Sequence, residues 1–177
     1  VIFKKISVTG QYLATIIETN NYNKNDYVIQ CASCYDELTK LYNREVLDIF
    51  LEKTNEKAFR EKESFSFMMF DIDDFKKVND TYGHQKGDEV IANISKIISS
   101  NIRKMDIAFR YGGEELCVIF PDANKDDAFK IAEKIRVKIQ DTYKDDLKTT
   151  VSVGVSDNSE LSNVDEIIKK ADENLYE

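Results

Sequence analysis

The stretch FRYGGEELCVIF, residues 109–120, decides the fold, because it places a tight turn between two apolar segments. Gly112 and Gly113 in that position are typical of a two-residue hairpin turn, so residues 107–111 and 115–120 are predicted to be paired antiparallel strands. Glu114 and Glu115 then lie at the base of the second strand. Because neighbouring side chains of a strand point to opposite faces, the two carboxylates cannot both be ordinary solvent-facing groups. Either one alone would be an ordinary solvated acid of a hairpin.

A second group of acids follows another apolar segment. Residues 64–72, SFSFMMFDI, are predicted to form a buried central strand that leads directly into Asp71, Asp73 and Asp74. A carboxylate at the end of a buried strand is costly unless it is paired or bound to a metal. The alternative is that these acids cap the following helix, which suits Asp73 or Asp74 better than Asp71. If the two strands are neighbours, Asp71 and Glu114 meet at one rim and offer the hard oxygen ligands that Mg²⁺ prefers.

The polar segment after this strand supplies groups that suit a nucleotide. Lys76 and Lys77 are able to reach phosphate, and backbone N–H groups near a short helix are able to cradle it. Asn79 and Asp88 offer an amide and a carboxylate for the edge of guanine, whose ring N–H and exocyclic amine are donors that adenine does not present in the same way. The residues alone leave a nucleotide site and a purely structural role both open.

The remaining sequence alternates between helical and strand patterns. A strand is predicted at residues 149–155, and helices are predicted at residues 36–59 with Asp36 as cap, 88–102, 126–140, and 163–175 with Asn163 as cap. This order indicates an α/β sandwich with an antiparallel hairpin at its centre. Residues 1–8 and 12–17 are predicted to form a β-hairpin, followed by a polar linker at 20–26 and a short helix at 27–35. We expect residues 1–35 to be the end of an upstream, sensor-type domain with its linker, and residues 36–177 to be a second domain.

Composition limits the classes of function. The chain has 177 residues, of which 42% are hydrophobic, and 33 acidic residues outnumber 25 basic ones for a formal charge of −8. This balance argues against non-specific binding of nucleic acid, which needs clustered cations. No apolar run approaches the roughly 20 residues that cross a bilayer. The three cysteines have no zinc-binding spacing and indicate a reduced chain, so we expect a cytoplasmic location. The chain would then be the cytoplasmic output domain of a larger protein, which a membrane anchor elsewhere in that protein would not contradict.

Several segments together resemble one known family. Residues 110–116, RYGGEEL, resemble the signature of the GGDEF diguanylate cyclases. Further segments follow in the family's order: DELTKLYNR at 36–44, DIDDFKKVND at 71–80, YGH and GD within 82–88, VSVGV at 151–155 and ADENLY at 171–176. One such motif is weak, whereas the ordered set is very specific. The resemblance implies an α+β fold like that of nucleotidyl cyclases and polymerase palms, with a central mixed, largely antiparallel sheet flanked by helices.

The resemblance also implies a set of metal ligands. It assigns Mg²⁺, or Mn²⁺, to Asp71, the backbone carbonyl of Ile72 and Glu114, with Glu115 supporting the metals. Glu114 is in addition the family's candidate for assisting deprotonation of the ribose 3′-hydroxyl.

Substrate contacts are implied in the same way. Asn79 and Asp88 correspond to the guanine-binding residues, and Lys76 with the Asp74–Phe75 backbone corresponds to the phosphate-binding groups. Family members with Ser at the position of Asp88 make mixed cyclic dinucleotides, so Asp88 favours GTP.

The implied reaction joins two GTP molecules into cyclic di-GMP, a bacterial second messenger, and releases two pyrophosphates. Each domain holds one GTP, so a homodimer is needed. Arg103 and Asp106 resemble the family's inhibitory site for the product; the alternative is a surface ion pair.

Two features depart from the family pattern. Leu116 stands where the family has Phe, which we expect to cause repacking only. The family usually continues past Leu175 and Tyr176 with a Lys and an Arg that grip the triphosphate, whereas this sequence ends at Glu177, so we expect a domain truncated at its C-terminus. Two alternatives to an enzyme are a silent module that binds GTP or cyclic di-GMP, and a dimerisation or relay module.

Overall fold

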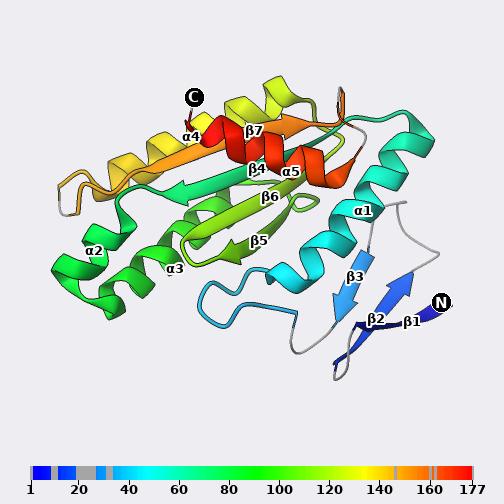
Figure 1. Cartoon of the computed structure of the whole chain (residues 1–177), viewed down its shortest axis with the longest axis horizontal. Helices are drawn as coiled ribbons and strands as arrows, with labels where there is room; N and C mark the ends of the chain where they lie inside the picture. Colours follow the sequence, from blue (N-terminus) through cyan, green and yellow to red (C-terminus); the bar gives the residue numbers. More distant parts are fainter. Residues whose placement is uncertain are drawn as a thin grey trace.

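The strand at residues 65–72 lies in the middle of a four-stranded sheet. A computed structural model describes residues 2–8, 12–18, 27–30, 34–145, 147–159, 161 and 163–176. The sheet has the order β5-β6-β4-β7, with β4 at Phe65–Ile72, β5 at Ile107–Gly112, β6 at Glu115–Pro121 and β7 at Val151–Asp157 (Figure 1). All pairs of neighbouring strands are antiparallel. In the described part of the chain the one parallel pairing is the isolated bridge between Tyr42 and Phe109, so the predicted mixed character is limited to that bridge.

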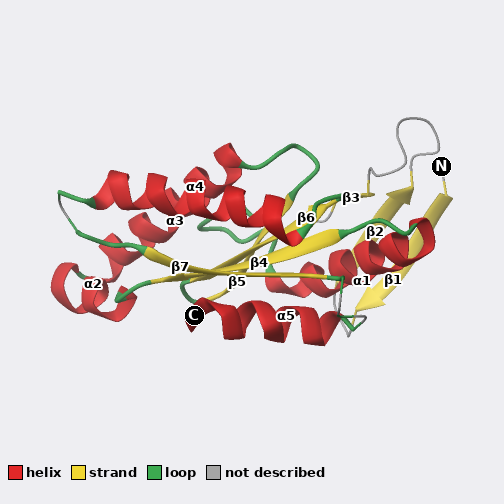
Figure 2. Ribbon diagram, turned by 90° about the horizontal axis from the view of Figure 1, so that it is seen from above, coloured by secondary structure: helices red, strands yellow, loops and turns green. Residues whose placement is uncertain are grey.

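The side chains of β4 alternate between two hydrophobic cores. Phe65, Phe67 and Met69 face one core, while Met68 and Phe70 face the other. Figure 2 shows the corresponding layers: α3 and α4 cover one face of the sheet, and α1 and α5 cover the opposite face. The bounds of these helices are Arg44–Glu61 for α1, His84–Asn101 for α3, Lys125–Tyr143 for α4 and Val164–Glu173 for α5. Burial on both faces explains why β4 reads as a continuous apolar run.

The predicted hairpin exists, but its place and its turn differ from the prediction. β5 and β6 pair antiparallel, yet β5 is at the edge of the sheet, so β6 and β4 are the central strands. Gly112 is the last residue of β5 and pairs with Glu115, which leaves Gly113 and Glu114 as the turn. A register irregularity between Arg110 and Gly112 causes this one-residue shift. Glu114 therefore lies in the turn itself and not on the strand.

The helix predicted from Asp36 begins eight residues later. α1 starts at Arg44 with Asn43 at its N-cap position. Asp36 instead closes a turn, since its carboxylate accepts from both the backbone N–H and the hydroxyl of Thr39, each at 2.8 Å. Tyr42 then bridges to β5 before the helix begins. Asn163 caps α5 as predicted, because its side chain accepts from the Asp165 N–H at 2.9 Å.

The segment between β4 and α3 contains a further helix. α2 spans Phe75–Tyr82 and leads into α3 through Gly83, so α3 begins one turn earlier than the predicted residue 88. Phe75 and Val78 of α2 join the core on the α3 and α4 side of the sheet. The two helices thus form a tight pair at the end of β4, beside the acids that follow this strand (Figure 1).

The N-terminal residues form a separate antiparallel sheet of three strands, β1 at Ile2–Val8, β2 at Tyr12–Glu18 and β3 at Tyr27–Gln30. The predicted β-hairpin is confirmed by the pairing of β1 with β2. The helix predicted at 27–35 is wrong at its start, because Tyr27–Gln30 pairs with β2. Tyr, Val and Ile are strong strand formers, which is consistent with this outcome. The predicted linker at 20–26 lies outside the described residues.

Helix α5 approaches β7 unusually closely. A Cβ atom at Gly154 would lie 1.9 Å from the Ala171 carbonyl oxygen, so only glycine fits between the two backbones. The Ser156 hydroxyl donates to the Ile167 carbonyl at 2.7 Å and fixes the same contact. This close packing brings Asp172 towards the rim at which β4 ends.

Among the described residues, no helix combines the length and the apolarity that a membrane span requires.

Candidate active site

The ends of β4 and β6 bring three acids to one rim of the sheet. Phe70 pairs with Leu116, so one step further along both strands Asp71 comes opposite Glu115. Asp71 shares the sheet face of Met69, and Glu115 shares that of Cys117, which is the α1 and α5 side. The two carboxylates therefore leave the sheet in the same direction. Glu114 lies beside them in the turn. Asp71 and Glu114 were expected to meet at one rim if their two strands were neighbours, and β4 and β6 are neighbours in the sheet.

These acids repel one another. Burial raises the pKa of Asp71, and the nearby charges of Glu114, Asp73 and Asp172 raise it further. Burial also raises the pKa of Glu115, with Asp71, Asp172 and Glu114 adding to the effect while Arg44 opposes it. Like charges held together at a half-buried rim are unfavourable unless a cation compensates them.

This donor set fits a hard divalent cation. Half-buried carboxylate oxygens beside the exposed end of a strand are the ligands that Mg²⁺ takes, usually one or two carboxylates completed by water and substrate phosphate. Within the described ranges, no three or more Asp, Glu, His or Cys side chains are already gathered around one metal position. Asp71, Glu114 and Glu115 are the carboxylates that a site completed by water and substrate phosphate would use.

Asp73 has a role that the sequence interpretation missed. Its carboxylate accepts hydrogen bonds from the hydroxyls of Thr150 and Ser152, the latter at 2.6 Å, and its N–H donates to the Thr150 carbonyl at 3.0 Å. Asp73 thus ties the end of β4 to the start of β7 and does not cap α2. The signal was present in the sequence as Thr150 and Ser152, two hydroxyl residues at the start of a predicted strand.

An acidic pocket of about 330 Å³ opens beside these groups. It is lined by Asp71, Asp73, Asp74, Ser152 and Leu175. Asp74 occupies the N-cap position of α2 with a left-handed backbone, φ 55°, and within the described residues its side chain makes no capping hydrogen bond. The alternative that Asp74 caps the following helix through its side chain is therefore wrong. Lys76, in the first turn of α2, is exposed on the same helix end.

The two residues predicted to contact guanine come from α2 and α3. Asn79 is half-buried, and its Oδ1 atom is buried without a hydrogen-bond partner in the described part of the protein. Asp88 is exposed in the second turn of α3. Since α2 and α3 pack as a pair, both side chains belong to the same helical unit at the end of β4. His84, the first residue of α3, is exposed.

An arginine of the signature segment fixes the turn that carries Glu114. Arg110 donates to the Gly113 carbonyl through Nε at 3.2 Å and Nη2 at 2.8 Å, and its Nη1 donates to Asp36 at 3.0 Å. Burial raises the pKa of Asp36, but hydrogen bonds from Thr39 and Arg110 outweigh it and leave this pKa below its usual value. Arg110 therefore connects the turn at residues 36–42 to the acidic hairpin, a contact across 74 positions of sequence that no local pattern indicates.

A second arginine, Arg44, lies on the α1 and α5 side of the sheet, where Tyr111 packs. The Arg44 guanidinium stacks over the Tyr111 ring, 3.7 Å from its centroid. Arg44 also lies near enough to Glu115 to oppose the rise of its pKa. Arg44 and Asp172 complete the charged surroundings of the rim, and sequence reasoning assigned neither of them to the site.

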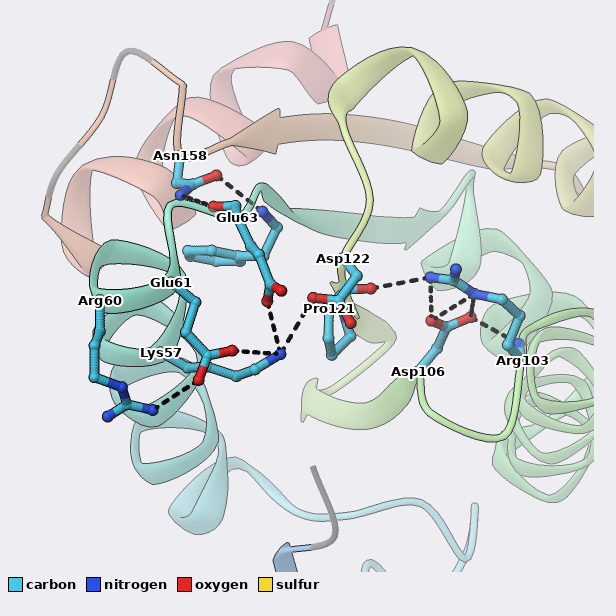
Figure 3. A network of polar contacts seen from close by, with 10 residues as sticks. Lys57, Arg60, Glu61, Glu63, Arg103, Asp106, Pro121, Asp122 and Asn158 are labelled. Atoms are coloured by element: carbon cyan, nitrogen blue, oxygen red, sulfur yellow. Dashed lines mark hydrogen bonds and ion pairs between the residues drawn. The ribbon is translucent and has the colours of Figure 1, made fainter. Parts of the chain in front are cut away.

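Arg103 and Asp106 form a bidentate ion pair away from this rim. The Asp106 side chain is fully buried, and the closest contact, from Arg103 Nη2 to Asp106 Oδ1, is 2.8 Å. Arg103 Nη2 also donates to the Pro121 carbonyl at 3.1 Å. Figure 3 shows this pair next to Asp122, which accepts from Lys57 at 3.2 Å. The pair is thus anchored to the end of β6, while the Arg103 side chain as a whole remains 45% exposed.

Comparison with known proteins gives the family and the fold of the chain. The family described as diguanylate cyclase, GGDEF domain, matches residues 33–177. The chain is 37% identical to the response regulator PleD of Caulobacter vibrioides, covering 88% of this chain and 36% of that protein. It is 35% identical to the diguanylate cyclase DgcM of Escherichia coli, covering 84% of this chain and 36% of that protein. Among solved structures, the GGDEF domain of DgcB from Caulobacter crescentus in complex with c-di-GMP superposes with a TM-score of 0.76, at 32% identity, over 85% of this chain and 91% of that one.

The antiparallel sheet with paired acids at its rim defines a GGDEF-type α+β domain. The chain belongs to the GGDEF diguanylate cyclase family. It spans about a third of the length of the curated relatives that it matches.

Proposed function

We propose that this chain is an active diguanylate cyclase, which condenses two GTP molecules into cyclic di-GMP and two pyrophosphates. The observation that carries the proposal is the group of mutually repelling carboxylates formed by Asp71, Glu114 and Glu115 at the ends of β4 and β6. Nucleotidyl transfer depends on neutralising phosphate charge and on in-line positioning, and such a group serves both needs once a divalent cation is bound. The three cysteines of the sequence have no zinc-binding spacing, which suits a reducing compartment, so we place the reaction in the cytoplasm.

Asp71, Glu114 and the Ile72 carbonyl would hold Mg²⁺ or Mn²⁺, with Glu115 supporting the site. When bound, the cation supplies charge neutralisation at the α-phosphate and lowers the pKa of the attacking hydroxyl. Asp73 keeps the Asp71–Asp74 segment in place through its hydrogen bonds to β7. Lys76 and the backbone at Asp74–Phe75, at the start of α2, would bind the phosphates.

The ribose 3′-hydroxyl of one GTP attacks the α-phosphate of the other, and Glu114 accepts the proton of that hydroxyl. A P–O bond to the 3′-oxygen forms while the bond to the leaving pyrophosphate breaks, and the same exchange in the opposite direction closes the ring. Asn79 and Asp88 orient each guanine so that the 3′-hydroxyl is held in line with the partner's phosphate.

Each domain has one such rim, so the two GTP molecules must be presented by two chains. We therefore expect activity per chain to rise with protein concentration until the dimer is saturated, because a monomer holds half of the reactants. Initial rates of pyrophosphate release over a hundredfold range of protein concentration, at saturating GTP, measure this. A specific activity that is constant across the range contradicts the dimer requirement.

The exposed edge of Arg103 is proposed to bind the product and so limit the reaction. Its Nε and Nη2 are engaged by Asp106 and Pro121, so the two N–H groups of Nη1 would be the donors to the O6 and N7 atoms of guanine. We expect Arg103→Ala to raise the cyclic di-GMP concentration for half-inhibition at least about tenfold, which is the loss of a contact of about 1.4 kcal/mol.

The matched control is Arg136→Ala, which removes another partly exposed arginine that pairs with an acid three positions away, Glu133. The control should leave inhibition unchanged. Because Arg103→Ala leaves the buried Asp106 with fewer partners, thermal melting is measured in parallel to verify that the variant is folded. Unchanged inhibition in folded Arg103→Ala rules out this site.

A further inference from the structure

The Asn79 side chain occupies the space in which a side chain at residue 87 would lie. A Cβ atom at Gly87 would be 2.0 Å from Asn79 Oδ1 and 3.0 Å from Asn79 Cγ. It would also lie 3.0 Å from Cζ of Phe75. Real Cβ atoms do not approach other heavy atoms to 2.0 Å, so any residue other than glycine at this position forces the amide to move.

This contact also determines where the amide lies relative to Asp88. Gly87 directly precedes Asp88 in α3, so an amide packed against the Gly87 backbone is next to the helix position that carries the carboxylate. The Asn79 carbonyl accepts from the Gly83 N–H at 2.8 Å, and the Gly87 N–H donates to the Gly83 carbonyl at 3.2 Å, so the same turn fixes both residues. Asn79 is half-buried, and its Oδ1 atom is buried.

Asn79 Oδ1 is also a hydrogen-bond acceptor without a donor in the described part of the chain. It is buried and has no hydrogen-bond partner among the described residues. A buried amide without a partner is unfavourable in the free protein and becomes favourable when a ligand supplies the complementary group. The packing against Gly87 thus holds the amide in a place where a ligand can supply the missing hydrogen-bond donor.

We infer that Gly87 is a specificity-determining position, whose missing side chain holds the Asn79 amide beside Asp88 and so sets the preference for guanine over adenine. This inference rests on the proposed function, because it takes the nucleotide to be GTP. Gly87 acts through Asn79 and is a positioning residue, not one that contacts the nucleotide by a side chain of its own.

The test is the binding of GTP and of ATP, each with Mg²⁺, to the full chain by titration calorimetry. Gly87→Ala should reduce the ratio of GTP to ATP affinity at least tenfold, as should Asn79→Ala. The double variant Gly87→Ala with Asn79→Ala should show the ratio of Asn79→Ala alone, because the amide that a Cβ at residue 87 displaces is gone and the remaining contact, 3.0 Å to Phe75 Cζ, does not involve the amide. Gln85→Ala, an exposed change two residues away on α3, is the control and should keep the wild-type ratio.

Alanine is a better helix former than glycine, so α3 itself does not oppose the change. If Gly87→Ala fails to fold, the double variant should restore folding, since the contact at 2.0 Å is gone and only the milder one with Phe75 Cζ, at 3.0 Å, is left. A double variant that also fails to fold overturns the inference. A Gly87→Ala protein with the wild-type ratio of GTP to ATP affinity overturns the inference too. So does a double variant in which the losses of this ratio from the two single variants simply add. These results differ from a failure of the proposed function, in which the wild-type chain itself does not prefer GTP to ATP.

Discussion

Replacing Asp71 by Asn is expected to reduce the rate of cyclic di-GMP formation at least about a thousandfold, which corresponds to about 4 kcal/mol of transition-state stabilisation. Asn has the size of Asp but lacks the charge that would hold a divalent cation against the α-phosphate. Asp71 lies opposite Glu115 at the rim, where no other residue of β4 takes its place. The rate is measured as pyrophosphate release at saturating GTP and Mg²⁺.

The same variant should be at least as stable as the wild type without metal. The pKa of Asp71 is raised in the folded chain by burial and by its acidic neighbours, so the folded state binds this proton more tightly than the unfolded state. Ionisation of Asp71 therefore disfavours folding once the pH rises above the ordinary pKa of an aspartate, and a neutral Asn removes that cost. Thermal melting at pH 7 without divalent cations checks this expectation.

A matched control is Asp126→Asn, an exposed acid in the first turn of α4 on the other side of the sheet from the acidic rim. It should change the rate by less than a factor of two. If Asp71→Asn retains more than a tenth of the wild-type rate, the assignment of this carboxylate to the metal site is wrong.

Replacing Arg110 by Met is expected to lower the rate about a hundredfold, because a displacement of about 1 Å in a reacting group has effects of that size. The guanidinium holds the Gly113 carbonyl with two hydrogen bonds, and Gly113 directly precedes Glu114 in the turn. Met keeps the apolar stem and removes all three donated hydrogen bonds, including the one to Asp36. Glu114 then lies in a turn that is free to take other conformations.

The effect of Arg110→Met should appear mainly in kcat, with the KM for GTP changed less than threefold, because Arg110 lies at the hairpin and not at α2 or α3. Arg136→Met, which removes an exposed ion pair on α4, serves as control. A kcat within a factor of three of the wild type would show that Arg110 supports the fold and not the position of Glu114.

The central sheet was predictable because local patterns determine it. The apolar run of β4 predicts a buried strand, and the Gly112-Gly113 pair predicts a hairpin, each without reference to distant residues. The strand and the hairpin are confirmed, whereas the turn lies one residue later than predicted. The juxtaposition of Asp71 with the hairpin acids depended on β4 and β6 being neighbours, which the sheet order confirms. The roles of Asn79, Asp88, Lys76 and the inhibitory pair remain predictions.

Other features depended on contacts that sequence patterns do not show. Asp36 looks like a helix cap, but the contact with Arg110 and the bridge from Tyr42 to β5 hold it in a turn instead. Asp73 looks like a second cap, yet hydroxyls on β7 bind it. Asp172 joins the acidic rim because α5 packs closely on Gly154, at a distance in sequence that no local pattern spans.

The most direct test of the account is the identification of the product formed from GTP. The wild-type chain, incubated with GTP and Mg²⁺, should yield cyclic di-GMP and two pyrophosphates for each molecule of product, and removal of Mg²⁺ by a chelator should stop the reaction. Quantitative chromatography of the nucleotides measures both. Binding of GTP with no cyclic di-GMP formed, at protein concentrations where the chain is dimeric, would contradict the account and indicate a silent GTP-binding module.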